Sequence, residues 1–585
     1  MAGPRPRQMA LAAALILQAS ATLAQDFERI APKEPPPNPP VQRLPVPALP
    51  PAAVPDGGAV ILPALKGLVF VGRTDALRRG GSDARGISVD GVDTLDRPEF
   101  RALLAPYLGQ PVTLDRLNEI TRATVVFSRQ NDRPLVDVIV PEQDVSSGTV
   151  QILVAEFVAG AIRPEGNRWF SDALLTGKVR TRPGERISAR SLLDDVNWLN
   201  QNPFRRVDLV YQRSAQPGAS DIVLRTTDRF PVRVFAGYEN TGSQSTERGR
   251  TFAGFNWGNA LWLDHQFSYQ FTTSPDFWRK GTGGRTHFTG HSASYVIPLP
   301  WRHKLTVFGS YAESLPKVPL SFRQLGRSSQ VSARYAVPLG EMWGATHEVQ
   351  AGFDWKRSNN SLEFGGTSVS SATSDIAQWM VGYGASRPDD WGLTAFSGSL
   401  FLSPGGFDAK NRTAAFQAQR AGAEGRYTYA RLGVDRVTTL PASFSWLVRV
   451  QGQLANRTLL PSEQLGFGGE ASVRGYDERQ VNGDQGLLVS SELRTPEFSL
   501  FKAVGEREMA DKLQLLAFWD YGVAHNRRLG VGEEKLTRLS SAGVGLRYAL
   551  APYALAKVDY GWQFIGAGRT AAGGGRPHFA ITFAY

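Results

Sequence analysis

The sequence predicts two small α+β domains followed by a sixteen-stranded antiparallel transmembrane β-barrel. Helical periodicity is confined to residues 64–229, where it is interleaved with short strand patterns. From Phe230 onward the chain instead alternates apolar and polar residues with the period of a β-strand. The composition agrees with this division, because 60 glycines and 10% aromatic residues suit many short strands joined by turns.

Residues 1–24 have the pattern of a secretory signal peptide. A basic start with Arg5 and Arg7 precedes an apolar run from Met9 to Leu17, and small residues follow up to Ala24. The run is shorter than the ~20 apolar residues that span a bilayer, so we expect cleavage and export from the cytoplasm. The chain has no cysteine, so its stability outside the cytoplasm cannot depend on disulfides.

Residues 25–63 form a proline-rich segment, with the prolines densest over residues 30–55. Such a segment favours extended polyproline II and cannot pack a core. The prediction is therefore a semi-rigid spacer, with a PxxP ligand as the less favoured alternative. The eight residues before the prolines, QDFERIAP, are too few to form a stable helix on their own.

Residues 64–157 and 158–229 repeat one order of elements, which is strand, helix, helix, strand, strand. The expected elements are residues 65–72, 99–108, 113–131, 133–143 and 149–157 in the first unit, and residues 157–166, 171–179, 188–204, 205–215 and 220–229 in the second. Thr113 is a suitable N-cap for the longest of these helices, and Asp115 in its first turn complements the helix dipole. Each unit can bury one face of a sheet against two helices.

The alternation in residues 230–585 has an apolar face with aromatic residues towards its ends and a polar face that can be wet. One face carries Phe444, Trp446, Val448, Val450, Leu454, Leu513, Leu515, Ala517, Trp519, Tyr521, Val523, Ala556, Val558, Tyr560 and Trp562. The other carries Ser443, Ser445, Arg449, Gln451, Gln453, Lys512, Gln514, Phe518, Asp520, Lys557, Asp559 and Gln563. A soluble sandwich has the same period with fewer outward aromatics, so lipid outside and water inside fit better.

Sixteen strands are predicted in this region. They begin near Val232, Thr251, Leu261, Arg285, Lys304, Ser321, Thr346, Ile376, Leu393, Gly425, Ser443, Gly486, Lys512, Leu539, Tyr553 and Pro577. Strands of about 10 residues with their turns average roughly 22 residues, which agrees with this count. If the first strand runs outward, residues 456–485 form the sixth outer loop, whose length of about 30 residues points to a function.

The formal net charge of +11 does not indicate a nucleic-acid-binding protein. Lysine and arginine are scattered along the chain, without a basic stripe or a recognition motif beside them. Anionic lipid headgroups are the partner that this charge favours, and no nucleic-acid partner is expected.

Three short motifs carry a resemblance to a known family. VRGY, at residues 473–476, resembles the motif in the sixth loop of outer-membrane transporters that carry periplasmic POTRA domains. FWDYG, at residues 518–522, resembles the FxDxG motif of their thirteenth strand, and PEQDVSSG, at residues 141–148, resembles the end of a first POTRA domain. Two POTRA domains before sixteen strands are the arrangement of the two-partner secretion transporters (TpsB), relatives of the haemolysin and filamentous-haemagglutinin secretors.

The resemblance implies a location and a function. The barrel would lie in the outer membrane of a Gram-negative bacterium, with both POTRA domains in the periplasm. The POTRA domains would recognise one large, unfolded, β-helical exoprotein, an adhesin, haemolysin or toxin, which the barrel would secrete without nucleotide hydrolysis. Further implied partners are outer-membrane lipid or lipopolysaccharide and, during biogenesis, the barrel-assembly machinery.

The resemblance also assigns a latch between the sixth loop and the barrel wall. The implied latch residues are Val473, Arg474, Gly475 and Tyr476 in the loop and Phe518, Asp520 and Gly522 in the wall. The alternation independently places Asp520 on the inner face, where an arginine can bind a carboxylate through two hydrogen bonds. Some family members also carry an N-terminal helix that plugs the pore, and the short QDFERIAP segment gives no reason to expect one here.

The exoprotein would first bind the exposed edge strands of the POTRA domains by adding a strand. The candidate segment is residues 205–215 with the neighbouring helix–strand groove, and the candidate side chains are Arg205, Arg206 and Tyr211.

No catalytic, metal-binding or cofactor-binding constellation is predicted. The seven histidines are dispersed without metal-ligand spacing, and the glycine motifs at Gly466 and Gly566 do not follow a strand of a βαβ unit. We therefore do not expect an enzyme. Two alternatives remain: an insertase of the same superfamily, which usually has more POTRA domains, and a passive diffusion porin.

Overall fold

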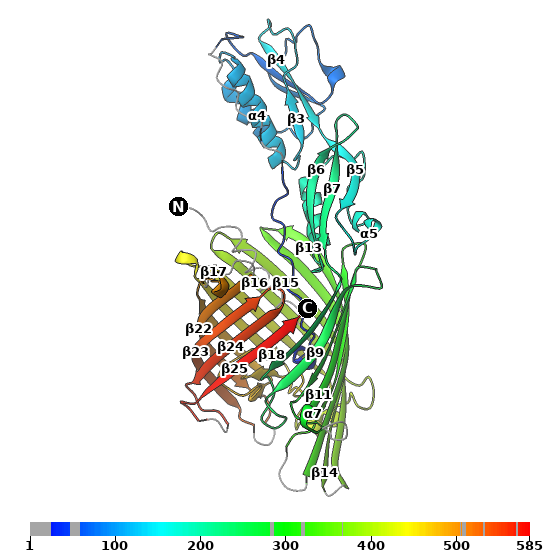
Figure 1. Cartoon of the computed structure of the whole chain (residues 1–585), viewed down its shortest axis with the longest axis vertical. Coiled ribbons are helices and arrows are strands. Elements are labelled where there is room, and N and C mark those ends of the chain that lie inside the picture. The colour runs from blue at the N-terminus through cyan, green and yellow to red at the C-terminus, as the bar shows by residue number, and fades with distance from the viewer. Residues whose placement is uncertain are drawn as a thin grey trace. The chain divides into compact units, whose positions relative to one another are not determined.

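The computed structural model describes residues 25–46, 49, 59–280, 286–317, 322–364, 367–503, 505, 510–529, 533–568 and 571–585. The chain forms two compact units (Figure 1). One unit is Pro40–Phe230, and the other joins Pro231–Tyr585 to the N-terminal residues through Pro39. The predicted signal peptide, residues 1–24, lies outside the described residues.

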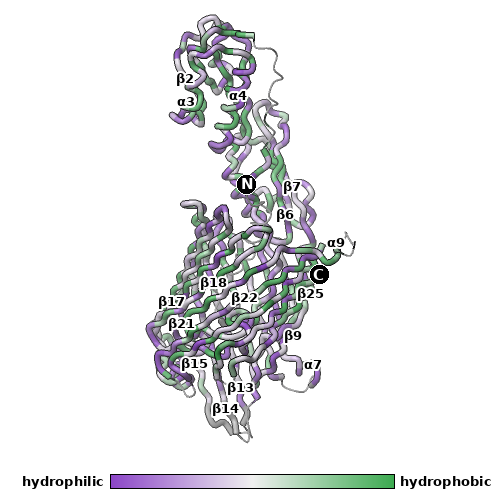
Figure 2. Tube along the Cα trace, turned by 90° about the vertical axis from the view of Figure 1, so that its left-hand side faces the viewer, coloured by the Kyte–Doolittle hydropathy of each residue, from purple (hydrophilic) through white to green (hydrophobic). Residues whose placement is uncertain are grey.

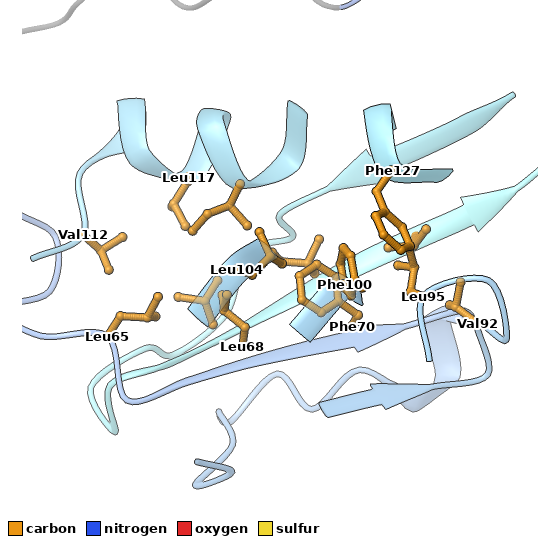
Figure 3. Close-up of a cluster of buried hydrophobic side chains, with 14 of the residues drawn as sticks. Leu65, Leu68, Phe70, Val92, Leu95, Phe100, Leu104, Val112, Leu117 and Phe127 are labelled. Atoms are coloured by element: carbon orange, nitrogen blue, oxygen red, sulfur yellow. The ribbon is translucent and has the colours of Figure 1, made fainter. Parts of the chain in front are cut away.

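The first domain of the Pro40–Phe230 unit is a four-stranded sheet covered by helices. Its elements are β1 (Gly67–Val71), β2 (Gly86–Asp90), α3 (Pro98–Leu104), η2 (Ala105–Tyr107), α4 (Leu114–Gln130), β3 (Val136–Ile139) and β4 (Thr149–Glu156), after a short η1 (Thr74–Ala76). The strand order is β2-β1-β4-β3. Figure 3 shows Phe100 between the sheet and α4, and its ring centroid lies 4.9 Å from that of Phe70 and 5.1 Å from that of Phe127.

In the first domain the predicted N-cap of the long helix is present, and the sheet has one strand that the sequence pattern did not predict. The Thr113 side chain accepts a hydrogen bond from the Arg116 backbone N–H at 3.2 Å and so caps α4. The sequence pattern did not predict β2, which pairs in parallel with β1 at the edge of the sheet. Its five residues, GISVD, are too few to show a clear alternation.

The second domain of this unit has the predicted strand, helix, helix, strand, strand order. Its elements are β5 (Val158–Glu165), α5 (Asp172–Thr176), α6 (Ala189–Leu199), β6 (Arg205–Arg213) and β7 (Ala219–Asp228). The strand order β5-β7-β6 leaves β6 at an edge. Leu192 and Leu199 of α6 are fully buried against Ile222 and Leu224 of β7, so the helix covers one face of the sheet.

The second unit is a closed antiparallel barrel of sixteen strands. They are β8 (Val232–Glu239), β9 (Arg250–Ala260), β10 (His265–Thr273), β11 (Phe288–Pro298), β12 (Lys304–Ser314), β13 (Phe322–Met342), β14 (Ala345–Phe364), β15 (Thr367–Asp389), β16 (Gly392–Ser403), β17 (Tyr427–Thr439), β18 (Ser445–Ala455), β21 (Gln485–Arg494), β22 (Asp511–His525), β23 (Leu536–Leu550), β24 (Ala554–Gln563) and β25 (Gly575–Ala584). The last strand pairs with the first, from Ala580↔Glu239 to Ala584↔Phe235. Closure therefore leaves no free sheet edge around the ring.

Short helices lie in the connections of the barrel. They are α7 (Phe277–Lys280), α8 (Thr413–Gln419), η4 (Pro441–Ser443) and α9 (Leu500–Ala503). Among the described residues, no helix is long and apolar enough to cross a bilayer.

The two faces of the barrel wall have the predicted chemistry. Trp519 is 43% exposed on the outside, whereas its neighbour Asp520 is fully buried on the inside. Figure 2 shows hydrophobic and hydrophilic residues interleaved along β18, β21 and β22. Exposed tryptophans mark successive turns at one rim, at Trp262, Trp301, Trp343 and Trp391. This ring is typical of the aromatic girdle at a membrane interface.

The prediction of one spacer over residues 25–63 is wrong for its first part. The short helix α2 (Gln25–Glu28) and the residues after it pack against the inner wall of the barrel. The Phe27 ring centroid lies 4.7 Å from that of Phe308, and the Lys33 Nζ lies 3.0 Å from a carboxylate oxygen of Glu239. Proline content does not exclude this arrangement, because the wall supplies partners for an extended chain that has no core of its own.

The next part of the predicted spacer belongs to the other unit. The Val41 backbone N–H donates to Asn197 Oδ1 at 2.8 Å, and Asn197 Nδ2 donates back to the Val41 carbonyl at 3.1 Å. Val41 and Leu44 also contact the buried core of the second domain. Most of residues 47–58 lies outside the described ranges.

Candidate functional site

The long connection between β18 and β21, residues 456–484, is called loop 6 below. It contains a two-stranded hairpin of β19 (Leu465–Phe467) and β20 (Val481–Gly483), with Leu465 paired to Gly483. Phe467, Val473 and Tyr476 are each fully buried and pack against the wall residues Leu488 and Leu539. The tip of the loop is therefore a packed element inside the barrel and does not extend into solvent.

Glycine at the tip allows the backbone to touch the wall. Gly475 has φ +92°, a left-handed conformation that strains other residues. A Cβ atom on Gly475 would lie 2.8 Å from the carbonyl oxygen of Gly561 on β24. Glycine is therefore required at this position both for its left-handed backbone conformation and for its lack of a side chain against Gly561. The sequence motif alone does not show which of these two requirements applies.

Arg474 and Asp520 form a bidentate ion pair. Arg474 Nε lies 2.7 Å from Asp520 Oδ2, and Arg474 Nη2 lies 2.8 Å from Asp520 Oδ1. The Arg474 backbone N–H also donates to Asp520 Oδ2 at 3.1 Å. Only 3% of Arg474 is exposed. Lysine could not reproduce this geometry, because it has a single nitrogen in place of a planar fork.

Other wall residues complete the charge balance around Arg474. Glu492 Oε1 on β21 lies 2.8 Å from Arg474 Nη1, and Asp559 Oδ1 on β24 lies 3.9 Å from it. Arg494 pairs with Glu492 at 2.6 Å, and Arg547 pairs with Asp559 at 2.8 Å. Three guanidinium groups thus face three carboxylates, so no charge in this network lacks an opposite partner.

The rest of the VRGY motif is held by main-chain contacts. The Gly475 backbone N–H donates to His578 Nε2 at 2.9 Å, and the Gln563 side-chain amide donates to the Gly475 carbonyl. The Tyr476 hydroxyl lies 2.7 Å from the Ile565 carbonyl oxygen and accepts from the Ser540 N–H at 3.2 Å. The loop tip is therefore bonded to β23, β24, β25 and the connection after β24.

The three motif residues of β22 have separate roles in this contact. Asp520 binds Arg474, and the Phe518 ring lies under the Arg474 guanidinium, 3.6 Å from ring centroid to Cζ. A Cβ on Gly522 would lie 2.9 Å from side-chain atoms of both Phe467 and Val473. The small residue therefore leaves room for the loop to pack.

The sequence motifs did not identify every residue of this site. Glu492, Ser490 and His578 also contact the loop tip, and none belongs to VRGY or FWDYG. Asp559 was placed on the inner face by its alternation, without a partner. For Glu492, Ser490 and His578, the only available sequence signal was a position on the inward face of a strand. Every inward polar residue of the wall has that signal, so it could not single out these three.

The three candidate residues on β6 have different environments. Arg205 is 2% exposed, its guanidinium lies 4.6 Å from the Phe170 ring centroid, and its Nε donates to the Leu199 carbonyl at 3.0 Å. The prediction that Arg205 contacts a client is therefore wrong, because its side chain is part of the domain core. Arg206 lies 3.6 Å from Asp208 and is half-exposed, so its side chain remains accessible.

Tyr211 lines a cavity of about 1000 Å³ between the two domains of the Pro40–Phe230 unit. One side of the cavity is formed by α4 and the edge strand β3, and the other by residues 211–220. The Tyr211 hydroxyl and Arg129 Nε are buried there without a hydrogen-bond partner among the described residues. Burial also raises the pKa of Tyr211. Buried polar atoms without a partner require an explanation, and they lie here beside an edge strand whose outer backbone groups can pair with an added strand.

Comparison with known proteins identifies the family. The model of the haemolysin secretion/activation protein ShlB/FhaC/HecB family matches residues 218–548. The chain belongs to this family. The ShlB-type POTRA domain model of the same family matches residues 83–156, within the first domain.

Relatives and solved structures agree with this family assignment. The heme/hemopexin transporter protein HuxB of Haemophilus influenzae is 23% identical over 470 residues, or 77% of each chain. The outer membrane transporter CdiB-2 of Burkholderia pseudomallei is 24% identical over 413 residues, covering 69% of this chain and 68% of the relative. The structure of CdiB from Escherichia coli covers 100% of both chains at 18% identity with a TM-score of 0.71. A BamA structure from Haemophilus ducreyi has the same fold over 85% of this chain at a TM-score of 0.50.

The family assignment makes the protein a transporter of the outer membrane, with its POTRA domains in the periplasm. Because β8 follows the second domain directly, the connections after β8, β10 and every second strand thereafter face outward, and loop 6 is one of them. Within the described ranges, no group of three or more His, Cys, Asp or Glu side chains could hold a metal ion.

Proposed function

We propose that this protein secretes one large exoprotein through its barrel, after recognising it unfolded in the periplasm. The observation that carries the proposal is that the interior of the barrel is occupied by other parts of the same chain. Loop 6 and residues 25–39 occupy the lumen and are held by side-chain contacts that can be broken, in particular Arg474 with Asp520. A diffusion porin has no need of such a removable obstruction, whereas an export channel must be closed when no substrate is in transit.

The proposed docking site for the exoprotein is the cavity between α4, β3 and residues 211–220. Strand β3 is at the edge of its sheet, so its outer N–H and C=O groups can pair with an added strand. The unpaired Tyr211 hydroxyl and Arg129 Nε would then bind main-chain or side-chain groups of that strand. An unfolded β-helical protein offers such strands repeatedly.

In the proposed cycle the Arg474–Asp520 pair is the latch of the resting state. Docking of the exoprotein precedes displacement of the luminal residues, and folding of the exoprotein outside the cell makes its return unfavourable. No nucleotide hydrolysis enters this scheme. Lipopolysaccharide around the barrel, and the barrel-assembly machinery during biogenesis, are the further partners that we propose.

The nature of the exoprotein follows only by analogy with relatives. Relatives are described as a heme/hemopexin transporter and as CdiB outer membrane transporters. We propose a two-partner system in which the partner is a TpsA-type adhesin, haemolysin or toxin.

Deletion of the gene tests the proposal. Proteins of the culture medium and of the outer membrane would be compared by mass spectrometry in the parent, the deletion strain and a complemented strain. Loss of one very large protein from the medium, with membrane barrels unchanged, is the expected result. Loss of many barrels from the membrane would identify an insertase instead, and no change in either fraction would favour a porin.

A further inference from the structure

Loop 6 has a second buried ionic contact, eleven residues before Arg474. Glu463 is fully buried, and its Oε1 lies 2.5 Å from Lys356 Nζ on β14. Its Oε2 accepts from the Tyr429 hydroxyl on β17 at 2.7 Å and from Gln378 Nε2 on β15 at 3.0 Å. The carboxylate is therefore bonded by three different wall strands.

The wall groups around Glu463 form a complete network. Gln378 Nε2 also donates to Asp354 Oδ2 at 3.0 Å, while its Oε1 accepts from the Tyr427 hydroxyl at 2.8 Å. Asp354 is in turn paired with Arg334 Nη2 at 2.6 Å. Every polar group of Gln378 is thereby satisfied, which fixes its orientation towards Glu463.

This network is separate from the one around Arg474. Glu463 side-chain contacts lie on β14, β15 and β17, whereas those of Arg474 lie on β21, β22 and β24. The two sets share no strand, so loop 6 connects two sectors of the wall. Release at one end alone would leave the loop attached at the other.

Lys356 also interacts with the N-terminal segment. The carboxylate of Glu28, next to the buried Phe27, interacts electrostatically with Lys356, Arg431 and Arg479. Lys356 is thus ion-paired with Glu463 of loop 6 and also attracted over a longer distance by Glu28 of the segment that occupies the lumen.

We propose that Lys356 and Glu463 form a second anchor, which positions loop 6 across the lumen and parts when the pore opens. The Arg474 end has the larger set of contacts, including the backbone bonds of Gly475 and the buried Tyr476, so the Lys356–Glu463 anchor parts before the Arg474–Asp520 latch. The inference rests on the proposed export function for its role in secretion, whereas its effect on the pore requires no exoprotein.

Charge exchange provides the test. The full-length protein would carry Glu463→Gln, Lys356→Met, or the double exchange Lys356→Glu with Glu463→Lys, with Arg436→Ala as the control. Among the described residues, the Arg436 side chain binds Asp389, at 2.5 Å, Thr394 and Thr438, which all lie on the wall. Conductance of each barrel would be measured in planar bilayers. Because the chain has no cysteine, Ser462→Cys added to each variant reports loop release through its maleimide labelling rate.

In each single variant we expect the frequency of conductance events and the maleimide labelling rate to rise about tenfold. A tenfold change corresponds to about 1.4 kcal/mol in the free energy of loop release. The double exchange should restore both towards the original values, and Arg436→Ala should change neither. Unchanged conductance and labelling in both single variants overturn the proposal, as does a double exchange whose conductance and labelling rate are as high as those of the single variants. The export function is tested separately, because its failure would show as an unchanged culture medium after gene deletion.

Discussion

Gly475 of loop 6 lies directly against Gly561 of β24, with room for no side chain on either residue. A Cβ on Gly475 would be 2.8 Å from the Gly561 carbonyl oxygen, and a Cβ on Gly561 would be 2.8 Å from the Gly475 nitrogen. This contact sets the depth at which the neighbouring Arg474 enters the wall. The ion pair with Asp520 therefore depends on backbone fit as well as on charge.

Gly475→Ala should displace the loop tip without any change of charge. The added methyl group meets backbone atoms and the residue keeps φ +92°, so both sterics and strain oppose the native position. We expect higher resting conductance in planar bilayers. Gly573→Ala is the matched control, because Gly573 has φ +84° but nothing within 4 Å of an added Cβ. Equal effects of the two substitutions would show that strain alone is responsible.

Asp520→Asn should release the latch. The substitution removes the bidentate partner of Arg474 and leaves it with Glu492 at 2.8 Å. Breaking a fully buried pair costs about 3–5 kcal/mol, and the cost falls where water enters the lumen. Conductance should rise and resistance of the barrel to heat denaturation on gels should fall. Asp389→Asn, which breaks a wall pair with Arg436, should leave conductance unchanged.

Arg474→Lys should be only a partial replacement. An ammonium group can approach Asp520 or Glu492 but cannot bind both oxygens of Asp520 in parallel. Its conductance should lie between that of the original protein and that of Arg474→Ala. A lysine variant indistinguishable from the original would mean that charge alone, and not the fork geometry, holds the loop.

Tyr211→Phe should separate stability from client binding. The Tyr211 hydroxyl has no partner among the described residues, so its removal should stabilise the Pro40–Phe230 unit by about 1 kcal/mol. The same change should weaken binding of the exoprotein, measured with the full-length transporter in detergent. Arg168→Ala, which changes a side chain outside the cavity lining that lies over the Trp169 ring, serves as the control. Stronger binding to Tyr211→Phe would exclude the hydroxyl as a contact.

Phe27→Ala should loosen the N-terminal segment inside the barrel. Phe27 is 2% exposed and packs on Phe308. Burial of an aromatic ring of this kind commonly contributes about 3–5 kcal/mol, so its loss should open the lumen more often. Higher conductance is expected, and an unchanged trace would show that the segment does not restrict the pore. Exposed Phe407, which is 72% accessible, offers a control for loss of a phenylalanine.

Much of the barrel could be predicted because lipid and water impose a strict alternation on each strand. Predicted strand starts fall within four residues of the observed ones except at β15, which begins at Thr367 and not near Ile376. Residues 367–378 extend beyond the pairing with β16, which starts at Trp379. Their serine- and threonine-rich sequence lacks apolar alternation, so the pattern gave no signal there.

The candidate site was predictable only where a motif or an inward position marked it. Arg474 and Asp520 had both signals, and the structure brings them together. Arg205 looked like an exposed cation on an edge strand, yet its neighbours Phe170 and Leu199 bury it. The luminal position of Phe27 had no local signal, because it depends on a wall formed more than 200 residues later in the chain.

The most direct measurement is the amount of the exoprotein in the medium of strains that carry the original protein, Asp520→Asn or Asp389→Asn at equal barrel levels. The account predicts that Asp520→Asn lowers secretion of that one protein severalfold, while Asp389→Asn secretes normally. Normal secretion by Asp520→Asn, with its conductance also unchanged, would contradict the claim that the Arg474–Asp520 pair controls an export pore.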